Sequence, residues 1–424
     1  MVGRGGRSGG FREVLALGEF RALFVAQWVT VVGDQLARVA LSVLVFGRTG
    51  SPGWAAVVYA LTFLPDLVGG PVLSGLADRF PRRSVMVVAD GVRAVLVGLM
   101  AVPGMPLPVV GVLVVGVHLL NAPWNAARAA LVAQVVPGRG LVAGMGLLSM
   151  VLQGGQVLGF AGGGALVAWL GPSGALLVNA VSFVVSAVLV GWGTGRRPAA
   201  SRPAASGTAR RGVWWRQVRA GVGLVWSDRR LRALVALGCV SGFYVAGEAL
   251  AAPYAAELGG GSVAVGLLLG AFAGGSVIGM VVLARAPDAN RERVLVPLPM
   301  VACAVLLGCA ADPSLPVTLG IFLVSGVASA YNVVASTMFV QHVPDERRGQ
   351  AFGLAITALR VSQGAGVVLA GASAEYLAPH VVVAGAGLLG TAAAGAAGWA
   401  WHRAALRPAD RPAGWRSAAG EASD

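Results

Sequence analysis

The sequence predicts an all-α membrane protein in which twelve transmembrane helices form two parallel six-helix halves. Three observations lead to this fold class. Only 12% of the 424 residues are charged, whereas 56% are hydrophobic, a balance far from that of soluble proteins. Apolar runs long enough to cross a bilayer recur along the whole chain. Polar residues of the first half also recur, at a constant offset, in the second half.

The spans follow from the lengths of the apolar runs, because a membrane helix needs about 20 mainly apolar residues. In chain order they are predicted at 22–46, 54–76, 84–103, 107–133, 142–169, 173–193, 231–256, 263–284, 294–311, 315–340, 350–376 and 380–402. The first run is too long for the apolar core of a signal peptide, so it is expected to stay as a membrane helix.

The arginines orient these spans. Arg48 lies in a loop on one side, and four arginines lie within spans (Arg38, Arg93, Arg128 and Arg360). The rest of the 32 basic residues lie in or next to the termini and the loops of the other side. Because positively charged loops stay in the cytoplasm, both termini are predicted to be cytoplasmic. The same bias explains the net charge of +14 without a nucleic-acid partner.

Loop lengths divide the chain into four expected parts. These are an N-terminal bundle over 1–193, a cytoplasmic linker over 194–230, a C-terminal bundle over 231–403 and a cytoplasmic tail over 404–424. Apolar residues at helical spacing near the end of the linker predict an amphipathic helix on the inner leaflet. A merely soluble connector is the alternative.

An internal repeat supports the division into two halves. Asparagine and glutamine are rare here, yet they recur at one offset, as Asn125 with Asn332, Gln134 with Gln341, and Gln156 with Gln363. Repeated halves are typical of secondary transporters. Glycines four residues apart in 142–169 and 263–284 also predict close helix packing, with gating by helix sliding as the alternative.

Several classes of enzyme and pump are excluded or disfavoured. All 32 basic residues are arginine, so the chain has no lysine for a Walker A phosphate loop or for Schiff-base chemistry. The four histidines are scattered, and the three cysteines show no CxxC spacing. We therefore expect no enzyme activity, no metal and no cofactor. The absence of lysine and the abundance of alanine, glycine, valine and proline suggest a bacterial genome rich in GC.

The loop between the second and third spans resembles a family signature. Residues 75–83 read Gly-Leu-Ala-Asp-Arg-Phe-Pro-Arg-Arg, similar to the Gly-x-x-x-Asp-Arg-x-Gly-Arg-Arg loop of the major facilitator superfamily, with Pro81 in place of a glycine. Further residues resemble its macrolide-efflux and enterobactin-exporter branch: Gly33-Asp34, Asp90 with Arg93, and 343–349. Span 142–169 lacks the Gly-Pro common in antiporters of the superfamily, since Gly159 precedes Phe160.

This resemblance implies the major facilitator fold and proton-coupled efflux of a small amphiphilic organic molecule by alternating access. It implies a multi-pass monomer in the bacterial cytoplasmic membrane, whose partners are the substrate, protons and membrane lipids. An importer or a lysolipid transporter on the same scaffold is the alternative. A membrane-embedded enzyme would need a cluster of metal-binding or acidic residues, which the sequence lacks. A sensor that has lost transport would be expected to lose its intramembrane carboxylates, whereas this chain retains them.

Two groups of ionisable residues are assigned roles. Carboxylates are rarely tolerated inside a membrane span without a function, and three are candidates for proton coupling: Asp34, Asp66 and Glu248. Arg38 lies one turn after Asp34, so an ion pair is available, and a purely structural pair is the alternative. A cytoplasmic gate network is assigned to Asp78, Arg79, Arg82, Arg83, Asp90, Arg93 and Arg128.

The substrate cavity of this superfamily is lined mainly by the first, fourth, seventh and tenth spans. Aromatic side chains with a few hydrogen-bonding groups suit a drug-sized amphiphile. The candidates are Gln27, Trp28, Gln35, Arg38, His118, Asn121, Trp124, Asn125, Phe243, Tyr244, Tyr331, Asn332 and Arg360. Each of them could equally hold two helices together.

Overall fold

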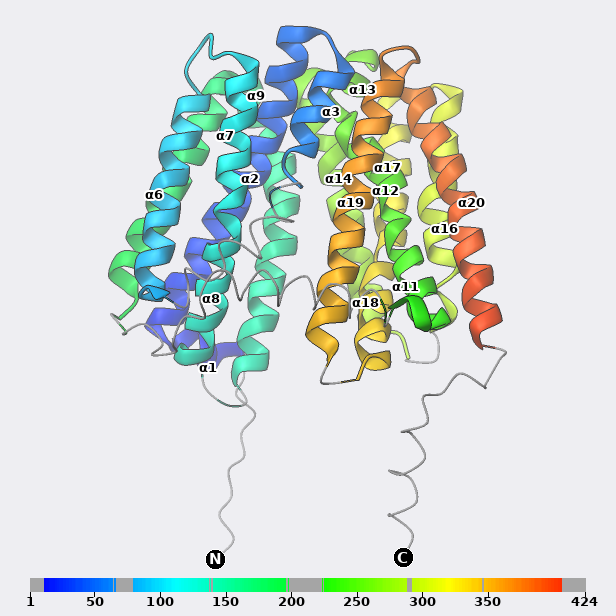
Figure 1. Cartoon of the computed structure of the whole chain (residues 1–424). Helices are drawn as coiled ribbons and strands as arrows, with labels where there is room; N and C mark the ends of the chain where they lie inside the picture. The colour runs from blue at the N-terminus through cyan, green and yellow to red at the C-terminus, as the bar shows by residue number, and fades with distance from the viewer. Residues whose placement is uncertain are drawn as a thin grey trace, which may run out of the picture.

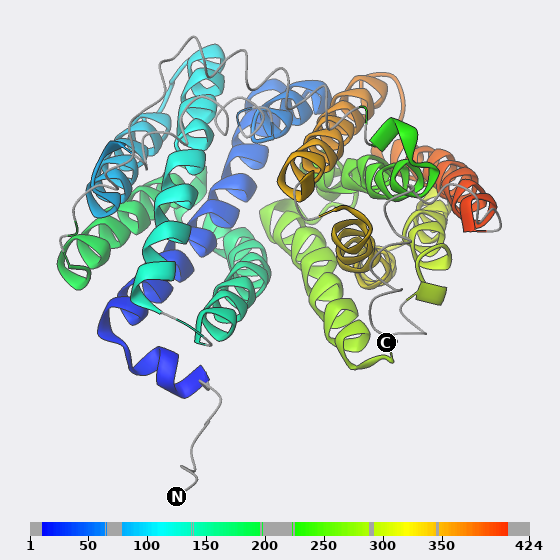
Figure 2. The same ribbon diagram turned by 60° about the horizontal axis from the view of Figure 1, so that its bottom comes forward.

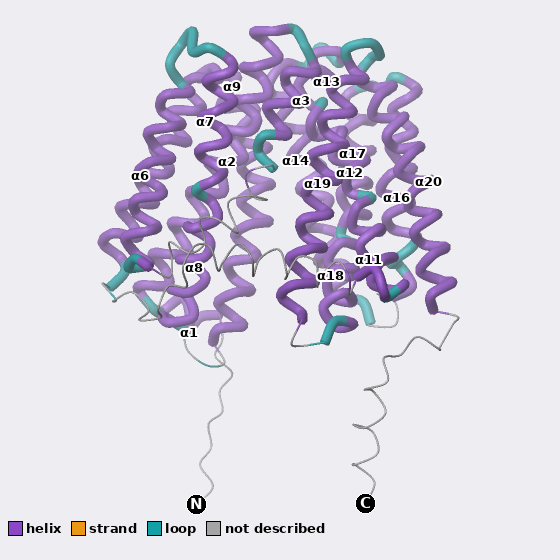
Figure 3. The backbone as a smooth tube through the Cα atoms, in the orientation of Figure 1, coloured by secondary structure: helices purple, strands orange, loops and turns teal. Residues whose placement is uncertain are grey.

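The computed structural model describes residues 11–405 apart from 64, 66–78, 137, 139, 196, 198–222, 224, 288–291 and 345–346. Every regular element in this part of the chain is helical (Figure 3). Asp66 and Asp78 lie outside the described residues, as does most of the predicted amphipathic helix.

The helices form two bundles that lie side by side (Figures 1 and 2). The N-terminal bundle holds α1 Phe11–Ala16, α2 Gly18–Thr49, α3 Pro52–Ala60, α6 Arg82–Met100, α7 Leu107–Leu119, α8 Asn121–Val135 and α9 Gly140–Gly193. The C-terminal bundle holds α11 Arg229–Cys239, α12 Ser241–Ala249, α13 Ala251–Glu257, α14 Gly261–Arg285, α16 Pro297–Ala304, the 3₁₀ helix η1 Val305–Ala311, α17 Leu315–Ser329, α18 Tyr331–His342, α19 Arg348–Ala374 and α20 Pro379–Ala405.

The helices match the predicted spans. Eight helical stretches of the described chain are long and apolar enough to cross a membrane, counting α7 with α8, α11 with α12, and α17 with α18 as single runs. One of them, α9, contains two predicted spans, which meet where Gly171 adopts a positive φ of 70° just before Pro172. The predicted span 54–76 begins as α3. The span 84–103 corresponds to α6, and the span 294–311 corresponds to α16 followed by η1.

The two ends of the molecule differ. We call the end that holds α1 and the last turn of α20 the terminal end (bottom of Figure 1). The opposite, distal end holds the connections between α2 and α3 and between α19 and α20 (top of Figure 1).

Glycines set the close packing within each bundle, as predicted. A Cβ atom at Gly159 of α9 would lie 2.7 Å from the backbone oxygen of Val32 in α2. In the other bundle, a Cβ at Gly279 of α14 would lie 2.8 Å from the Cβ of Ala330. Any larger side chain at these positions would push the helices apart.

The two bundles also meet through glycines. A Cβ at Gly164 of α9 would lie 2.6 Å from the backbone oxygen of Ser262 and 2.9 Å from the Cα of Gly266 in α14. A second contact joins α3 to α19, where a Cβ at Gly371 would lie 3.4 Å from the Cα of Gly53. Both contacts lie toward the distal end, so the halves are held together there.

We predict that Gly164→Ala weakens the contact between the halves. The added methyl group overpacks a backbone contact, which costs about 1–3 kcal/mol, and should lower the thermal unfolding temperature of the detergent-purified protein. Gly162→Ala is the matched control, because a Cβ there meets nothing within 4 Å. Equal unfolding temperatures for the two variants would contradict the close crossing of α9 and α14.

Candidate functional site

A carboxyl group inside the membrane region is shared by the two bundles. The hydroxyl of Tyr59 in α3 donates a hydrogen bond of 2.7 Å to Oε2 of Glu248 in α12. Tyr59 is 3% exposed and packs in an apolar cluster with Phe63, Val245 and Val367, which also spans both bundles. This polar contact is therefore shielded by apolar side chains.

Two arginines from opposite bundles lie beside this contact. The guanidinium carbon of Arg38 in α2 is 6.0 Å from the centre of the Phe63 ring, and that of Arg360 in α19 is 5.6 Å from the same centre. Both arginines act electrostatically on Glu248. We call Arg38, Tyr59, Phe63, Glu248 and Arg360 the interface cluster. Its charge is one carboxylate between two cations.

Asp34 lies one turn before Arg38 but faces the interior of the N-terminal bundle. It lines a cavity of about 20 Å³ together with Arg38, His118 and Asn179, a volume that can hold one water molecule. Within the described chain no ion pair joins Asp34 to Arg38. The available pair is not formed because Arg38 extends to the Phe63 ring at the interface cluster. The cations that act on Asp34 are Arg93 and Arg38.

A second network lies wholly inside the N-terminal bundle. Asp90 and Arg93 of α6 are both buried and form an ion pair at 3.4 Å. The other oxygen of Asp90 accepts hydrogen bonds from Trp124 Nε1 at 3.0 Å and from Ser186 Oγ at 2.7 Å. Arg93 also donates to Asn121 Oδ1. These bonds tie α6 to α8 and α9.

The same network continues to α2. Arg128 donates to Gln27 Oε1 and lies 5.4 Å from the Trp124 ring centre. Gln27 in turn donates from Nε2 to the backbone oxygen of Leu148 at 3.3 Å. Four helices of one bundle are thus joined by hydrogen bonds among buried and partly buried polar groups, which is expected to make the bundle rigid.

The structure divides the predicted gate network into two parts. Asp90, Arg93 and Arg128 lie with the cavity candidates Gln27, Asn121 and Trp124 in the network just described. Arg82 and Arg83 instead donate to the backbone oxygens of Ala130 and Gly191, near the terminal end. Arg79 is exposed.

The aromatic candidates of the C-terminal bundle hold helices together. Tyr331 is fully buried and donates to the backbone oxygen of Leu237 at 2.9 Å. Asn332 donates from Nδ2 to the hydroxyl of Tyr244 at 2.6 Å, and Phe243 packs beside Gly390 of α20. These contacts between helices are those that the alternative interpretation predicts, and Asn332 also lines a small cavity between α11, α18 and α19.

The remaining cavity candidates are less connected. Trp28 lies against Gly154 of α9, and Asn125 is exposed. Gln35 is buried, and its Oε1 has no hydrogen-bond partner within the described residues.

A distal contact between the halves was not predicted. Glu375, just after α19, accepts hydrogen bonds from Ser51 Oγ and, at 2.7 Å, from the backbone nitrogen of Gly53. An exposed glutamate in a short loop carries no signal in the sequence that would identify it as a contact.

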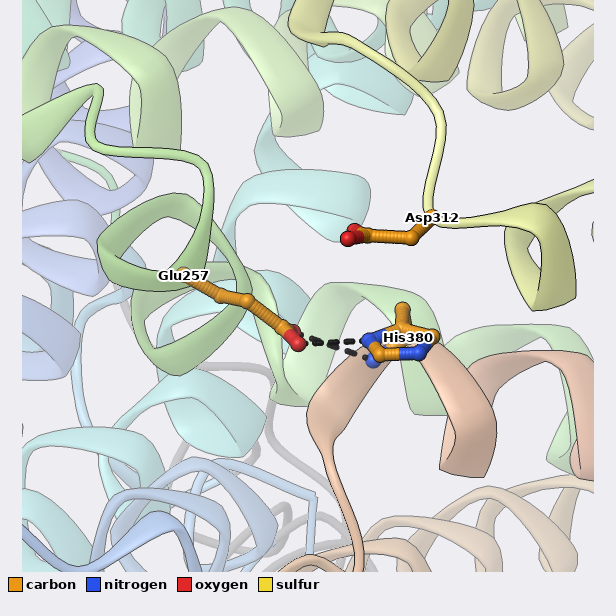
Figure 4. A group of neighbouring side chains, drawn as sticks. All are labelled: Glu257, Asp312 and His380. Atoms are coloured by element: carbon orange, nitrogen blue, oxygen red, sulfur yellow. Dashed lines mark hydrogen bonds and ion pairs between the residues drawn. The ribbon is translucent and has the colours of Figure 1, made fainter.

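A cluster at the distal end of the C-terminal bundle gathers donor atoms that could hold a metal ion (Figure 4). Ligand atoms of Glu257, Asp312 and His380 lie within 4.8 Å of one another. Glu257 already accepts hydrogen bonds from Nδ1 of His380 at 2.5 Å and from its backbone nitrogen at 3.3 Å. The carboxylate and the imidazole are thus paired with each other, and they join the end of α13 to the start of α20.

Known proteins resemble this chain along nearly its whole length. It is 29% identical over 393 residues to the multidrug efflux pump Tap of Mycobacterium tuberculosis, covering 85% of this chain and 88% of Tap. It is 27% identical over 384 residues to the uncharacterized MFS-type transporter YvqJ of Bacillus subtilis, covering 87% and 89%.

Solved structures show the same fold. The nucleoside transporter NupG superposes with a TM-score of 0.69 at 13% identity, covering 90% of this chain and 99% of NupG. At that identity the likeness establishes the arrangement of helices alone. The model of the Major Facilitator Superfamily matches residues 23–285 and 233–422. The chain therefore belongs to the Major Facilitator Superfamily, a family of membrane transporters rather than enzymes.

Proposed function

We propose that the protein exports a small amphiphilic organic molecule in exchange for protons by alternating access. The observation that carries this proposal is the hydrogen bond between Tyr59 and Glu248, because it places an ionisable group between two bundles that must separate. Ionisable groups at such positions are typical of ion pathways in transporters.

The charge of Glu248 supplies a physical link between proton binding and access. As a carboxylate it attracts both Arg38 and Arg360, which belong to opposite bundles. When it takes up a proton, this attraction is lost and the bundles are held together less strongly on the distal side. A ligand shifts a conformational equilibrium by its difference in affinity for the two states, and the proton is such a ligand.

We further propose that Asp34 is a second proton carrier and that Asp66 is a third. Asp34 shares its small cavity with Arg38, so a change in its charge acts on the same arginine that faces Glu248. Arg38 thereby connects a carboxyl group inside one bundle to the carboxyl group between the bundles.

The proposed direction and substrate class draw on the relatives. A relative covering most of this chain is named a multidrug efflux pump. The candidate cavity residues supply aromatic surface, as at Trp28, and hydrogen-bonding groups, as at Gln35, and this mixture suits an amphiphile. We propose that the terminal end faces the cytoplasm and that loop 75–83 and its arginines gate that side.

The exported class can be tested in cells. Expression of the protein should raise the concentration of some amphiphilic antibiotics needed to stop growth and should lower the accumulation of ethidium. The Glu248→Gln variant, confirmed to be inserted, is the inactive comparator. Greater accumulation on expression of the wild type would indicate import, the alternative, and would overturn the proposed direction.

The proposed topology predicts which positions of the chain can be labelled from outside the cell. In a background in which Cys239, Cys303 and Cys309 are replaced by serine, a membrane-impermeant maleimide should modify Pro313→Cys in intact cells. Ala419→Cys should react only after the cells are opened. The reverse pattern would contradict the orientation.

If transport is coupled to protons, the neutral variants Glu248→Gln and Asp34→Asn should lose the response of transport to a pH gradient. In proteoliposomes, transport of a substrate found in cells should no longer respond to a pH gradient, whereas exchange of labelled for unlabelled substrate should persist. The exposed Glu292→Gln serves as a control and should keep the wild-type response. Gradient-driven transport in both membrane variants would place the proton site elsewhere or require a different coupling ion.

A further inference from the structure

A basic cavity opens at the terminal end of the C-terminal bundle, between α11 and α20. Its volume is about 620 Å³, and three arginines line it: Arg229, Arg232 and Arg403. Its remaining described lining consists of alanines, and no acidic side chain is among them. Excess positive charge is therefore concentrated in one hollow of the surface.

Helical spacing explains how the hollow is built. Arg229, Arg232 and Ala236 lie three and four residues apart, so they share one face of α11. Ala400 and Arg403 share a face of α20 in the same way. Along α11 the two arginines precede Ala236, and along α20 Arg403 follows Ala400, so the arginines lie nearer the terminal end than these two alanines, because α11 begins and α20 ends there. The result is a charged rim above a floor of small apolar side chains.

Neighbouring groups leave this charge uncompensated. Asp228, the acidic residue next to the rim, accepts hydrogen bonds from the backbone nitrogens of Arg230 at 2.7 Å and Leu231 at 3.3 Å, as the N-cap of α11. Arg230 adds a further cation beside the cavity, since its Nε donates to the backbone oxygen of the lining residue Ala404 at 3.5 Å. Within the described chain, the rim arginines thus have no carboxylate partner.

Two exposed tryptophans lie close in sequence to the cavity arginines. Trp399 is 59% exposed, and the guanidinium carbon of Arg403 lies 3.8 Å from its ring centre. Trp226, just before α11, is 68% exposed. Tryptophan is enriched where a membrane protein meets the lipid headgroups. The arginine rim is therefore expected to lie at headgroup depth, with the alanine floor within reach of acyl chains.

We propose that this cavity is a binding site for an anionic phospholipid. The guanidinium groups bind the phosphate, for which their planar pairs of N–H donors are suited, and the acyl chains lie along the alanines. Basic hollows between transmembrane helices are suited to such headgroups. The apolar floor favours a lipid over a free phosphate ion, which would gain nothing from it. The bound lipid would hold α11 against α20. Because α11 is followed directly by α12, the lipid would act on the same predicted span that carries Glu248.

Lipid binding can be measured directly by native mass spectrometry on the detergent-purified full chain. The probes are phosphatidylglycerol, phosphatidylcholine with the same acyl chains, and inorganic phosphate. The triple variant Arg229→Gln, Arg232→Gln, Arg403→Gln should bind phosphatidylglycerol at least about tenfold more weakly than the wild type. Binding of phosphatidylcholine should not change. Inorganic phosphate at millimolar concentration should fail to displace the bound lipid.

A charge-matched control separates a built site from general surface charge. The triple variant Arg12→Gln, Arg21→Gln, Arg285→Gln removes the same charge from exposed positions outside the cavity. It should bind phosphatidylglycerol like the wild type. Equal losses in the two triple variants would overturn the site, as would unchanged binding in the cavity variant. Displacement by inorganic phosphate would show a free-anion site and overturn the lipid assignment. Unchanged unfolding temperatures in phosphatidylcholine would confirm that the cavity variant is folded.

Discussion

The arrangement of this transporter depends on how it keeps a carboxylate in the membrane between two bundles. An unpaired charge there would be expensive, so Glu248 needs partners. The partners come from both sides of the interface: Tyr59 and Arg38 from the N-terminal bundle and Arg360 from the C-terminal bundle. Because no single bundle satisfies Glu248, its stabilisation depends on the contact between them. The cluster of apolar side chains that includes Phe63 shields this contact from water, which strengthens it.

The polar groups of the N-terminal bundle serve a different purpose. Asp90 is bonded to Arg93, Trp124 and Ser186, and all four residues belong to this bundle. A bundle held in this way can move as a rigid body, while the interface cluster is made and broken. Asp34 lies between the two networks, since Arg93 acts on it from one and Arg38 from the other. The lipid site proposed between α11 and α20 would stabilise the second rigid body.

Sequence reasoning was most successful where local pattern decides the structure. Apolar length predicted the spans, and glycine spacing predicted close packing within α9 and α14, because both depend on residues near one another in the chain. The rarity of carboxylates inside apolar spans also identified Glu248 and Asp34 as candidate functional residues. Tyr59 could not be identified, because its hydroxyl is ordinary until Glu248, 189 residues away, is placed beside it. The Asp34–Arg38 pair failed for a related reason: spacing along a helix permits a contact, but a distant group, the Phe63 ring, decided where Arg38 points.

We propose that the charge on Glu248 holds the bundles together on the distal side. Double electron–electron resonance measures the distance between spin labels attached at Trp54→Cys and Tyr376→Cys, in the background without native cysteines. This distance reports how far apart the two bundles are at the distal end. Both positions are exposed, 51% and 90%, and belong to opposite bundles at the distal end. In the wild-type protein, acidification should increase the population with a long distance. In Glu248→Gln this population should be high and independent of pH. A distance distribution in Glu248→Gln that matches the wild type, with its pH dependence intact, would contradict this role of Glu248.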